Sequence, residues 1–344
     1  MKLNPVGIDL SKSVFQLSLA DGKYRVVARK RLSRRQFHRW LATTERAHLV
    51  MEACGTSHHW GRLAQSHGHQ VTLLHAKYVK AYVRRHKTDS ADADALLQAV
   101  QDDQIKPVPV KDEDRQALQS VHQVRERWKS TRVASLNTAR ALLAEFGICL
   151  PKAVTVARLR NACQQAPELL RHTLDALIED IEGLEHRLKQ VDRDLKHVAA
   201  HDDYCQRLMQ VNGVGVTIAT AAVARVPHIH GFRSGRSFAG WLGLTAREYS
   251  SGGTRRLGRI SKQGDRYLRT LIIHGARAAL LAARRKRKHD KPITRLEQWA
   301  LNTEARVGHN KATVAMANKM ARILWAVWTR QTDFNGDDAM RFAA

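Results

Sequence analysis

The chain has 344 residues, more than one compact domain usually holds, and 43% of them are apolar, which excludes disorder throughout. Its 58 lysines and arginines exceed 32 acidic residues, so the formal net charge is +26. Such a charge makes a compact chain repel itself unless a polyanion balances it. Nucleic acid is therefore the expected partner, and a basic membrane-surface protein is the alternative.

The apolar runs and the cysteines of the chain indicate the cellular compartment in which the protein works. No apolar run approaches the length of a membrane-spanning helix, and the first residues lack the apolar core of a signal peptide. The four cysteines stand far apart with no CxxC pair, which argues against a zinc ribbon or a disulfide framework. We therefore expect a protein of a reducing cytoplasm, associated with the nucleoid and with no membrane partner.

Charge is distributed unevenly along the chain. Residues 1–100 carry a net charge of +10 and residues 201–344 one of +15, whereas residues 101–200 carry only +1. A uniformly basic surface would not give this pattern. It predicts two domains that face nucleic acid and a neutral spacer that joins them.

Residues 1–105 are predicted to form an α/β domain. Short apolar or alternating runs indicate strands, and Asp21-Gly22 is typical of a hairpin turn. The expected order is three strands, helix, strand, helix, strand and helix. The strands are expected at residues 6–10, 15–19, 24–31, 47–52 and 70–74, and the helices at 35–43, 57–66 and 89–100.

Four carboxylates of this domain occupy unusual positions. Asp9 lies inside an apolar strand, where a charge is costly unless something pairs with it, and Glu52 ends the next core strand. Asp89 and Asp92 are three residues apart and share a helix face. Converging carboxylates raise one another's pKa unless a cation lies between them, and their oxygens suit Mg²⁺ or Mn²⁺. Two such ions can hold a phosphodiester for cleavage.

Each carboxylate also has a structural interpretation. Asp9 fits a turn after a strand, and Glu52 fits an ion pair with a nearby arginine. Asp89 fits a helix N-cap and Asp92 a first helical turn, where the helix dipole favours negative charge. Taken singly, these interpretations are as good as metal binding.

The motifs around these carboxylates carry a family resemblance. Three stretches, VGIDLSKSVFQL, MEACG and KTDSADADAL, resemble the N-terminal domain of the DEDD transposases of bacterial insertion sequences. That family includes the pilin-gene invertase and bridge-RNA-guided serine recombinases. The resemblance implies a RuvC-like domain of the ribonuclease H fold, as in the Holliday-junction resolvases. It also implies that Asp9, Glu52, Asp89 and Asp92 bind the metal, with Asp94 as the alternative to Asp92.

Residues 106–200 are predicted to be a helical spacer. Pro107 and Pro109 end the first domain, residues 111–146 form a long amphipathic pattern, and apolar residues then repeat in heptads. The heptad helix can pair with helix 111–146 of its own chain or with a second chain, and the resemblance implies a dimerising coiled coil. The heptad positions are Leu170, Leu174, Leu177, Ile181, Leu184, Leu188, Val191, Leu195 and Val198.

Residues 201–332 are predicted to be a mainly α-helical domain. The Gly-Val-Gly at 213–215 lies between helical segments and predicts a helix-hairpin-helix, whose N–H groups can hold a phosphate; a plain turn is the alternative. Residues 267–283 form a helical pattern that ends in a basic cluster, and residues 333–344 are expected to be a frayed polar tail. The cluster expected to contact nucleic acid comprises Arg284, Arg285, Lys286 and Arg287.

Residues 238–265 are rich in glycine, serine and arginine and are predicted to be a loop. Its Ser-Ser-Gly-Gly run can present a hydroxyl beside a bound phosphate, whose non-bridging oxygens arginines would hold. The alternative is a basic loop whose serines only donate hydrogen bonds to phosphates. The basic residues expected to bind nucleic acid in this loop and directly after it are Arg247, Arg255, Arg256, Arg259, Lys262 and Arg266.

The same loop carries the second part of the resemblance. The stretch LGLTAREYSSGGTRRLGRISKQGDRYLR resembles the C-terminal domain of the DEDD transposases. The resemblance implies that Ser251 is a catalytic serine. Ser250 is the alternative, because two adjacent serines leave the register open.

We therefore expect a DNA transposase or recombinase of an insertion sequence. Its predicted reaction is Mg²⁺-dependent strand cleavage and exchange through a phosphoserine-linked DNA intermediate. The resemblance also implies a structured non-coding guide RNA, the bridge RNA, and a homo-oligomer that is a dimer or, on double-stranded DNA, a tetramer. One alternative is a metal-dependent nuclease like the Holliday-junction resolvases, with no serine nucleophile. Another is a non-enzymatic nucleic-acid-binding protein.

Overall fold

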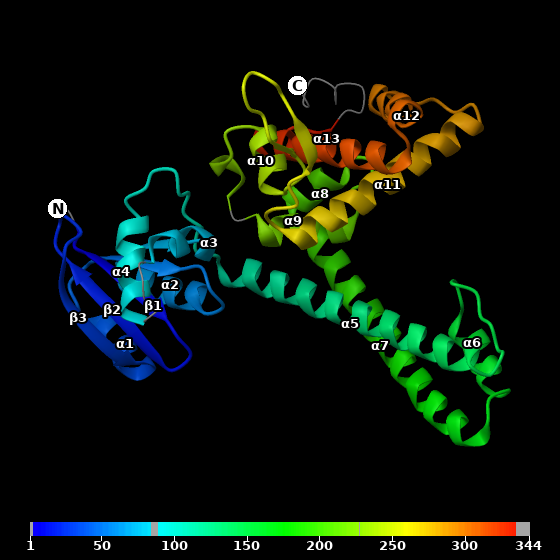
Figure 1. Ribbon diagram of the computed structural model, residues 1–344, viewed down its shortest axis with the longest axis horizontal. Coiled ribbons are helices and arrows are strands. Elements are labelled where there is room, and N and C mark those ends of the chain that lie inside the picture. Colours follow the sequence, from blue (N-terminus) through cyan, green and yellow to red (C-terminus); the bar gives the residue numbers. More distant parts are fainter. Residues whose placement is uncertain (1–2, 84–88, 227, 335–344) are drawn as a thin grey trace. The chain divides into compact units, whose positions relative to one another are not determined.

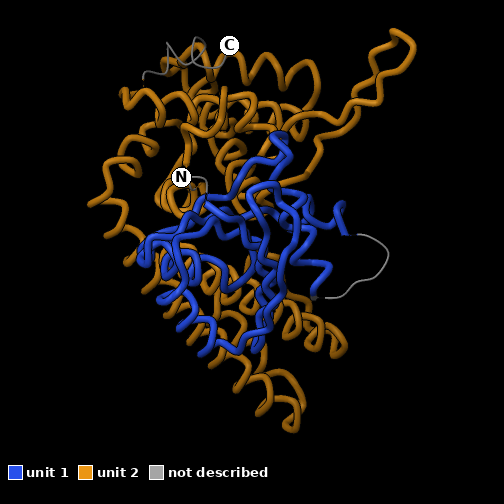
Figure 2. The backbone as a smooth tube through the Cα atoms, turned by 90° about the vertical axis from the view of Figure 1, so that its left-hand side faces the viewer, with its two compact units in different colours: residues 1–116 blue, residues 117–344 orange. Residues whose placement is uncertain are grey.

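The computed structural model describes residues 3–83, 89–226 and 228–334 (Figure 1). The chain divides into two compact units, residues 1–116 and residues 117–344 (Figure 2). The finer division predicted at residues 105, 200 and 332 stays a prediction, and most of the predicted tail lies outside the described residues. Within the described ranges no helix combines the length and apolar content needed to cross a bilayer.

The first unit is built on a five-stranded sheet in the order β3-β2-β1-β4-β5. Strands β1, β2 and β3 are antiparallel, whereas β4 and β5 continue the sheet parallel to β1. This mixed sheet confirms the predicted α/β class and agrees with the ribonuclease-H-like arrangement. The strands are β1 (Pro5–Leu10), β2 (Val14–Ala20), β3 (Val26–Ser33), β4 (His48–Glu52) and β5 (Gln70–Leu74).

Helices cover both faces of this sheet. Met51 packs with Phe37 and Trp60 of α1 and α2, whereas the next residue along β4, Val50, packs with Leu96 of α4. Because successive strand residues point to opposite faces, a strand buried on both faces is apolar throughout. The helices are α1 (Arg34–Thr43), α2 (Ser57–Ser66) and α4 (Asp89–Ala99), with α3 (Ala76–Val79) and the 3₁₀ helix η1 (Lys80–Tyr82) as unpredicted short turns.

The predicted spacer consists of the long helices α5 (Glu113–Ala144) and α7 (Glu168–Ala200), joined through α6 (Val156–Cys163). Some heptad residues are already buried within one chain, because α5, α6 and α7 share an apolar cluster. Ion pairs between α5 and α7 add to it. Buried in this cluster are Ala139, Leu143, Leu159, Leu174 and Ile181, and the ion pairs are Arg125–Asp192 and Arg132–Glu185.

Part of the predicted apolar side of α5 is exposed instead. At 3.6 residues per turn, Val121, Val124 and Leu142 fall on one side of α5, and each is at least 36% exposed; Phe146, two residues beyond the end of α5, is 51% exposed. The pairing of α5 with α7 therefore leaves an apolar stripe of the spacer uncovered in a single chain. The coiled coil between chains remains a prediction.

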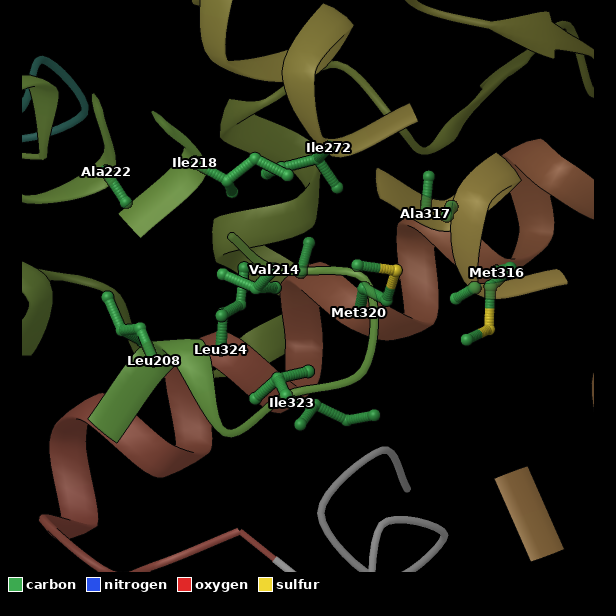
Figure 3. Close-up of a cluster of buried hydrophobic side chains, with 14 of the residues drawn as sticks. Leu208, Val214, Ile218, Ala222, Ile272, Met316, Ala317, Met320, Ile323 and Leu324 are labelled. Carbon is green, nitrogen blue, oxygen red and sulfur yellow. The ribbon is translucent and has the colours of Figure 1, made fainter. Parts of the chain in front are cut away.

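The rest of the second unit is mainly helical and encloses the largest apolar core of the described chain (Figure 3). Its centre includes Leu208, Val214, Ile218, Ile272 and Leu324. The helices are α8 (Asp203–Met209), α9 (Val216–Arg225), η2 (Ile229–Gly231), α10 (Gly235–Trp241), α11 (Arg266–Lys288), α12 (Arg295–Val307) and α13 (His309–Arg330).

The predicted loop 238–265 is wrong in two places. Its first residues belong to helix α10, and its centre is a hairpin of β6 (Ala246–Glu248) and β7 (Leu257–Ile260). Gly252 and Gly253 both have positive φ, as a tight two-residue hairpin turn requires, so the Gly-Gly pair was the overlooked strand-turn signal. The basic cluster 284–287 also lies within the last turns of α11, beyond the predicted helix end.

The glycine turn at 213–215 has a packing role. Gly213 has φ +89°, and a Cβ on it would lie 2.4 Å from the carbonyl oxygen of Gly275 in α11. A Cβ on Gly275 would in turn lie 2.3 Å from the Gly213 oxygen. This mutual contact alone accounts for Gly213, and phosphate binding by a helix-hairpin-helix stays a prediction.

Candidate active site

Strand pairing brings two of the predicted carboxylates to neighbouring positions in the first unit. The parallel register of β1 and β4 ends at Ile8 opposite Met51, and the following residues are Asp9 and Glu52. Ile8 and Met51 are buried on the α1–α2 face, so the next side chains point to the face that α4 covers. Asp9 and Glu52 are both half-buried there, at the carboxyl ends of two adjacent strands.

Helix α4 lies close against β1 and carries the other predicted ligands. A Cβ on Gly7 would lie 2.2 Å from the carbonyl oxygen of Ala93, so the helix backbone contacts the strand directly. Asp92, which precedes Ala93, is half-buried. Asp89 is the first residue of α4, and its side chain lies outside the described part of the structure.

Asp94, the alternative fourth ligand, is already engaged. Its Oδ1 accepts a hydrogen bond of 2.6 Å from the hydroxyl of Ser18, and its Oδ2 pairs with Arg29 at 2.7 Å. These partners lie on β2 and β3, away from Glu52 on β4. The contacts favour Asp92 over Asp94 as a metal ligand.

The residues present suit a hard divalent cation. Asp9 and Glu52 are carboxylates at the carboxyl ends of two adjacent inner strands, and Asp92 is a carboxylate on α4, all within a strongly basic unit. Oxygen ligands are those that Mg²⁺ prefers. Among the side chains that the structure describes, which exclude that of Asp89, no group of three is close enough to hold a metal. The four-carboxylate site therefore stays a prediction that depends on Asp89.

The two candidate serines differ in their contacts at the tip of the hairpin. Ser250 donates a 2.6 Å hydrogen bond to a carboxylate oxygen of Glu248 and accepts one from the backbone N–H of Arg256. Ser251 pairs with Thr254 through backbone hydrogen bonds on either side of the Gly-Gly turn. Its side chain is exposed, and its hydroxyl has no hydrogen-bond partner among the described residues. The hairpin thus holds the Ser250 hydroxyl and presents that of Ser251.

A buried arginine that the sequence analysis missed closes the base of this hairpin. Arg269 of α11 is only 7% exposed, and it donates hydrogen bonds to the carbonyl oxygens of Leu242 and Gln263, at 3.0 and 2.9 Å. Gly264 adopts φ +80°, and a Cβ there would lie 1.7 Å from the oxygen of Trp241. Both ends of the serine segment therefore meet at Arg269. An arginine beside apolar Leu268 and Ile272 was the signal in the sequence.

The predicted nucleic-acid-binding residues fall into two groups. Arg284 and Lys286 are held in ion pairs by Glu304 and Glu297, whereas Arg285 and Arg287 are exposed and have no ion-pair partner in the described ranges. In the hairpin, Arg255 pairs with Glu248 at 3.6 Å, and Arg247 donates to the carbonyl oxygen of Ser261. The other predicted cations, all exposed, are Arg256 and Arg259 of the hairpin, Lys262 just after it and Arg266 at the start of α11.

A buried histidine, also missed, links α5 to the start of α11. Thr220 donates to the oxygen of Val216, so its hydroxyl accepts from Nε2–H of His122, and Nδ1 accepts from the Tyr267 hydroxyl at 3.1 Å. Burial, with Arg125 and Arg225 nearby, lowers the pKa of His122 to about 4. The imidazole is therefore neutral near pH 7.

This network continues to the end of the serine segment. Arg225 stacks over the ring of Tyr267 at 4.8 Å and pairs with Asp265 at 2.6 Å. Asp265 in turn caps α11 by accepting a hydrogen bond from the N–H of Leu268. These hydrogen bonds and the ion pair connect helices α5, α9 and α11 at the point where the chain leaves the hairpin.

Comparisons with known proteins identify the family. The family model described as "Transposase IS116/IS110/IS902 family" matches residues 205–291, and a DEDD model described as "Transposase" matches residues 6–148. The chain is 39% identical to the "Probable family 20 transposase" of Pseudomonas aeruginosa over 96% of this chain and 98% of that protein.

Two further relatives belong to named insertion sequences. The transposase for IS1111A of Coxiella burnetii is 34% identical over 96% of this chain and 90% of its own length. The transposase for IS1328 of Yersinia enterocolitica is 32% identical over 96% of this chain and 98% of its own length. The expected class of enzyme, one that cleaves and recombines DNA, is thereby confirmed. The chain belongs to the IS116/IS110/IS902 family of insertion-sequence transposases.

Proposed function

We propose that this transposase cleaves the DNA of its element by metal-dependent chemistry at Asp9, Glu52, Asp89 and Asp92. The observation that carries the proposal is the pairing of β1 with β4, which places Asp9 beside Glu52 on the face that α4 covers. The match of a DEDD transposase model to residues 6–148 supports it. The nuclease interpretation, first weighed as an alternative, is thus the better supported part of the mechanism.

The residues of the site have separate tasks. A bound divalent metal, Mg²⁺ or Mn²⁺, would act as a Lewis acid on the scissile phosphate. Asp9 and Glu52 bind it from the ends of adjacent strands, which gives their side chains a rigid base. Asp92 binds from α4, whose position depends on the contact of Gly7 with Ala93. The net charge of +10 on residues 1–100 attracts DNA despite the carboxylates.

A second step at Ser251 is favoured by one observation. The Ser251 hydroxyl is exposed at the hairpin tip and is not hydrogen-bonded by any described residue, whereas that of Ser250 is. In this step the Ser251 oxygen bonds to phosphorus and the DNA hydroxyl leaves with a proton. A second DNA end then displaces the serine. Arg256 and Arg259 would hold the non-bridging oxygens.

One experiment separates the two chemistries. The protein is incubated with Mg²⁺ and element-end DNA, and products are resolved for cut strands and for covalent protein–DNA adducts. Loss of cutting in both Asp9→Ala and Glu52→Ala, with DNA binding kept, is expected; full cutting by both would overturn the metal site. An adduct that disappears in Ser251→Ala is expected for the serine step. Strand cutting without any covalent adduct would refute the serine step and leave the metal-dependent nuclease mechanism as the only one supported.

Guide RNA and oligomer are further parts of the proposal. A structured transcript of the element is the proposed guide, supported by the charge of +15 on residues 201–344. Strand exchange that is equally efficient and equally specific without the transcript would refute guidance.

A second copy of the chain is the proposed partner of the exposed α5 stripe. Val121→Asp with Val124→Asp should then give a smaller folded particle in light scattering, and an unchanged mass would refute it.

A further inference from the structure

A cavity of about 400 Å³ lies in the second unit at the foot of the serine hairpin. Ala246 of β6 and Ile260 of β7, which are paired across the hairpin, form part of its wall. Helix α13 contributes most of the other lining residues, and Trp299 of α12 also lines the cavity. The side-chain amide of Asn318 donates a 3.0 Å hydrogen bond to the oxygen of Leu244, which ties α13 to the segment leading into β6.

The charges in this cavity have one sign. Lys311, Lys319 and Arg322 line it from α13, and no acidic residue is among the described residues that line it. Arg322 is half-buried, has no ion-pair partner in the described ranges, and has a lowered pKa because of burial and the nearby Arg236. Burial, and then Arg322, also lower the pKa of Lys319. A half-buried guanidinium without a balancing carboxylate, which is the situation of Arg322, is stabilised by an anion.

The aromatic wall adds a second kind of recognition. Nζ of Lys319 lies 4.2 Å from the ring centroid of Trp299, which is half-buried. Apolar residues of the hairpin and α13 complete the lining. Cations beside an aromatic ring are the combination that holds single-stranded nucleic acid, through phosphate contacts and base stacking. A free phosphate would use only the cations.

We propose that this cavity binds one nucleotide of the DNA strand being processed. Lys311, Lys319 and Arg322 contact its phosphate, and its base packs against Trp299. The proposal rests on the proposed function in one respect, the choice of DNA over RNA. DNA is favoured because the strands lining the cavity are those of the hairpin that presents Ser251 to a DNA phosphate. The cavity would thereby fix the strand at the foot of the hairpin.

Binding is measured with the full chain in EDTA, so that no cleavage contributes. The probe is a fluorescein-labelled single-stranded DNA of about 12 nucleotides, within the usual site size of single-strand binders. The variant Lys311→Gln/Lys319→Gln/Arg322→Gln is expected to bind about tenfold more weakly. The magnitude of its slope of log affinity against log salt should fall by about 0.7, since the three cations contact one phosphate and each phosphate contact on a single strand contributes about 0.7. The matched control removes three exposed cations of α7, as Arg187→Gln/Lys189→Gln/Lys196→Gln.

A second pair of probes tests the base. Wild-type protein should prefer the ordinary strand to one of the same length without bases, and Trp299→Leu should lose that preference. Affinity of the cavity variant within twofold of the α7 control overturns the proposal. The proposal is also overturned if Trp299→Leu keeps the preference for the strand with bases. It is overturned as well if the cavity variant loses affinity for an RNA strand but not for DNA.

Folding and function are controlled separately. Circular dichroism shows whether a variant that binds DNA more weakly is still folded. Arg322→Lys keeps the positive charge and should therefore keep the affinity for DNA. If the triple variant does not fold, the single variant Lys311→Gln, at an exposed position, tests the proposal in its place. Its slope of log affinity against log salt must still be smaller in magnitude than that of the wild type. The covalent adduct assay is independent of these measurements. If no adduct forms but the cavity variant still binds DNA more weakly, only the serine step is refuted. If the adduct forms but the cavity variant binds DNA as well as the α7 control does, only the cavity proposal is refuted.

Discussion

Gly7 of β1 and Ala93 of α4 meet backbone to backbone: a Cβ atom on Gly7 would lie 2.2 Å from the carbonyl oxygen of Ala93. Ala95, Leu96 and Ala99 then bury the inner side of α4 against the sheet. This contact seats α4 on the strand that carries Asp9 and sets the position of Asp92. A glycine inside a core strand is thus part of the support of the proposed metal site.

Gly7→Ala should therefore harm both stability and cleavage. The added methyl group must displace backbone, so we expect a loss of about 1–3 kcal/mol in the free energy of unfolding, together with weaker metal-dependent cutting. Chemical denaturation and the cleavage assay measure the two effects. Gly22→Ala is the matched control, because nothing lies within 4 Å of its added Cβ. Equal stability of the two variants would contradict this account of the seat of α4.

Asp92 and Asp94 should respond differently to the same change. Asp92→Asn should abolish strand cutting, because a metal ligand loses its charge. Asp94→Asn should lower stability by less than about 1 kcal/mol and leave cutting nearly intact, because it weakens the partly exposed pair with Arg29. Arg29→Gln should match Asp94→Asn. Cutting that survives Asp92→Asn and fails in Asp94→Asn would reverse the assignment.

The two serines should separate in the adduct assay. Ser251→Ala should remove the covalent protein–DNA species completely. Ser250→Ala should only reduce it, because the lost hydrogen bond to Glu248 loosens the hairpin without removing the attacking hydroxyl. Mass spectrometry of the trapped peptide identifies the modified residue. A phosphodiester found on Ser250 would show that the register is wrong.

Arg269→Lys should impair the serine step although the charge is kept. The guanidinium donates from one nitrogen to the oxygens of Leu242 and Gln263, and an ammonium on a differently shaped side chain does not reproduce this geometry. We expect at least tenfold less adduct while metal-dependent cutting remains. Arg266→Lys, at an exposed position of the same helix, is the control. Identical adduct yields in both variants would exclude a positioning role for Arg269.

The second unit should lose stability in acid through His122. The pKa of His122 is lowered to about 4 in the folded state, against about 6.5 when unfolded, so the unfolded state binds more protons between these values. Stability should fall as the pH is lowered from 6.5 towards 4, by about 3 kcal/mol at most, and should not depend on His122 above that window.

Hydrogen exchange can assign this effect to one unit. His58 of the first unit also has a pKa lowered to about 4, by burial first and then by Lys111 and Arg62. Peptides from residues 117–344 should therefore lose their acid sensitivity in His122→Gln but not in His58→Gln. Unchanged acid sensitivity of these peptides in His122→Gln would show that another group is responsible.

Local properties of the chain determined most of its elements and its family. The alternation of β1 to β3, the apolar β4 and β5 and the helical periodicity of α5 and α7 are all carried by neighbouring residues, so the sequence predicts them directly. The same holds for the uneven charge and for the motifs around Asp9 and Ser251. The order of elements followed from these signals, and the α/β class was confirmed.

Only the tertiary structure decided which groups meet. The engagement of Asp94 depends on Ser18, 76 residues away, and the closure of the hairpin depends on Arg269 reaching back to Leu242, 27 residues away. Likewise, the cations of α13 form a cavity only because α12 and the hairpin fold against them. The reason is physical: a hydrogen bond or a desolvated charge is set by the atoms around it, and chain spacing does not encode those neighbours.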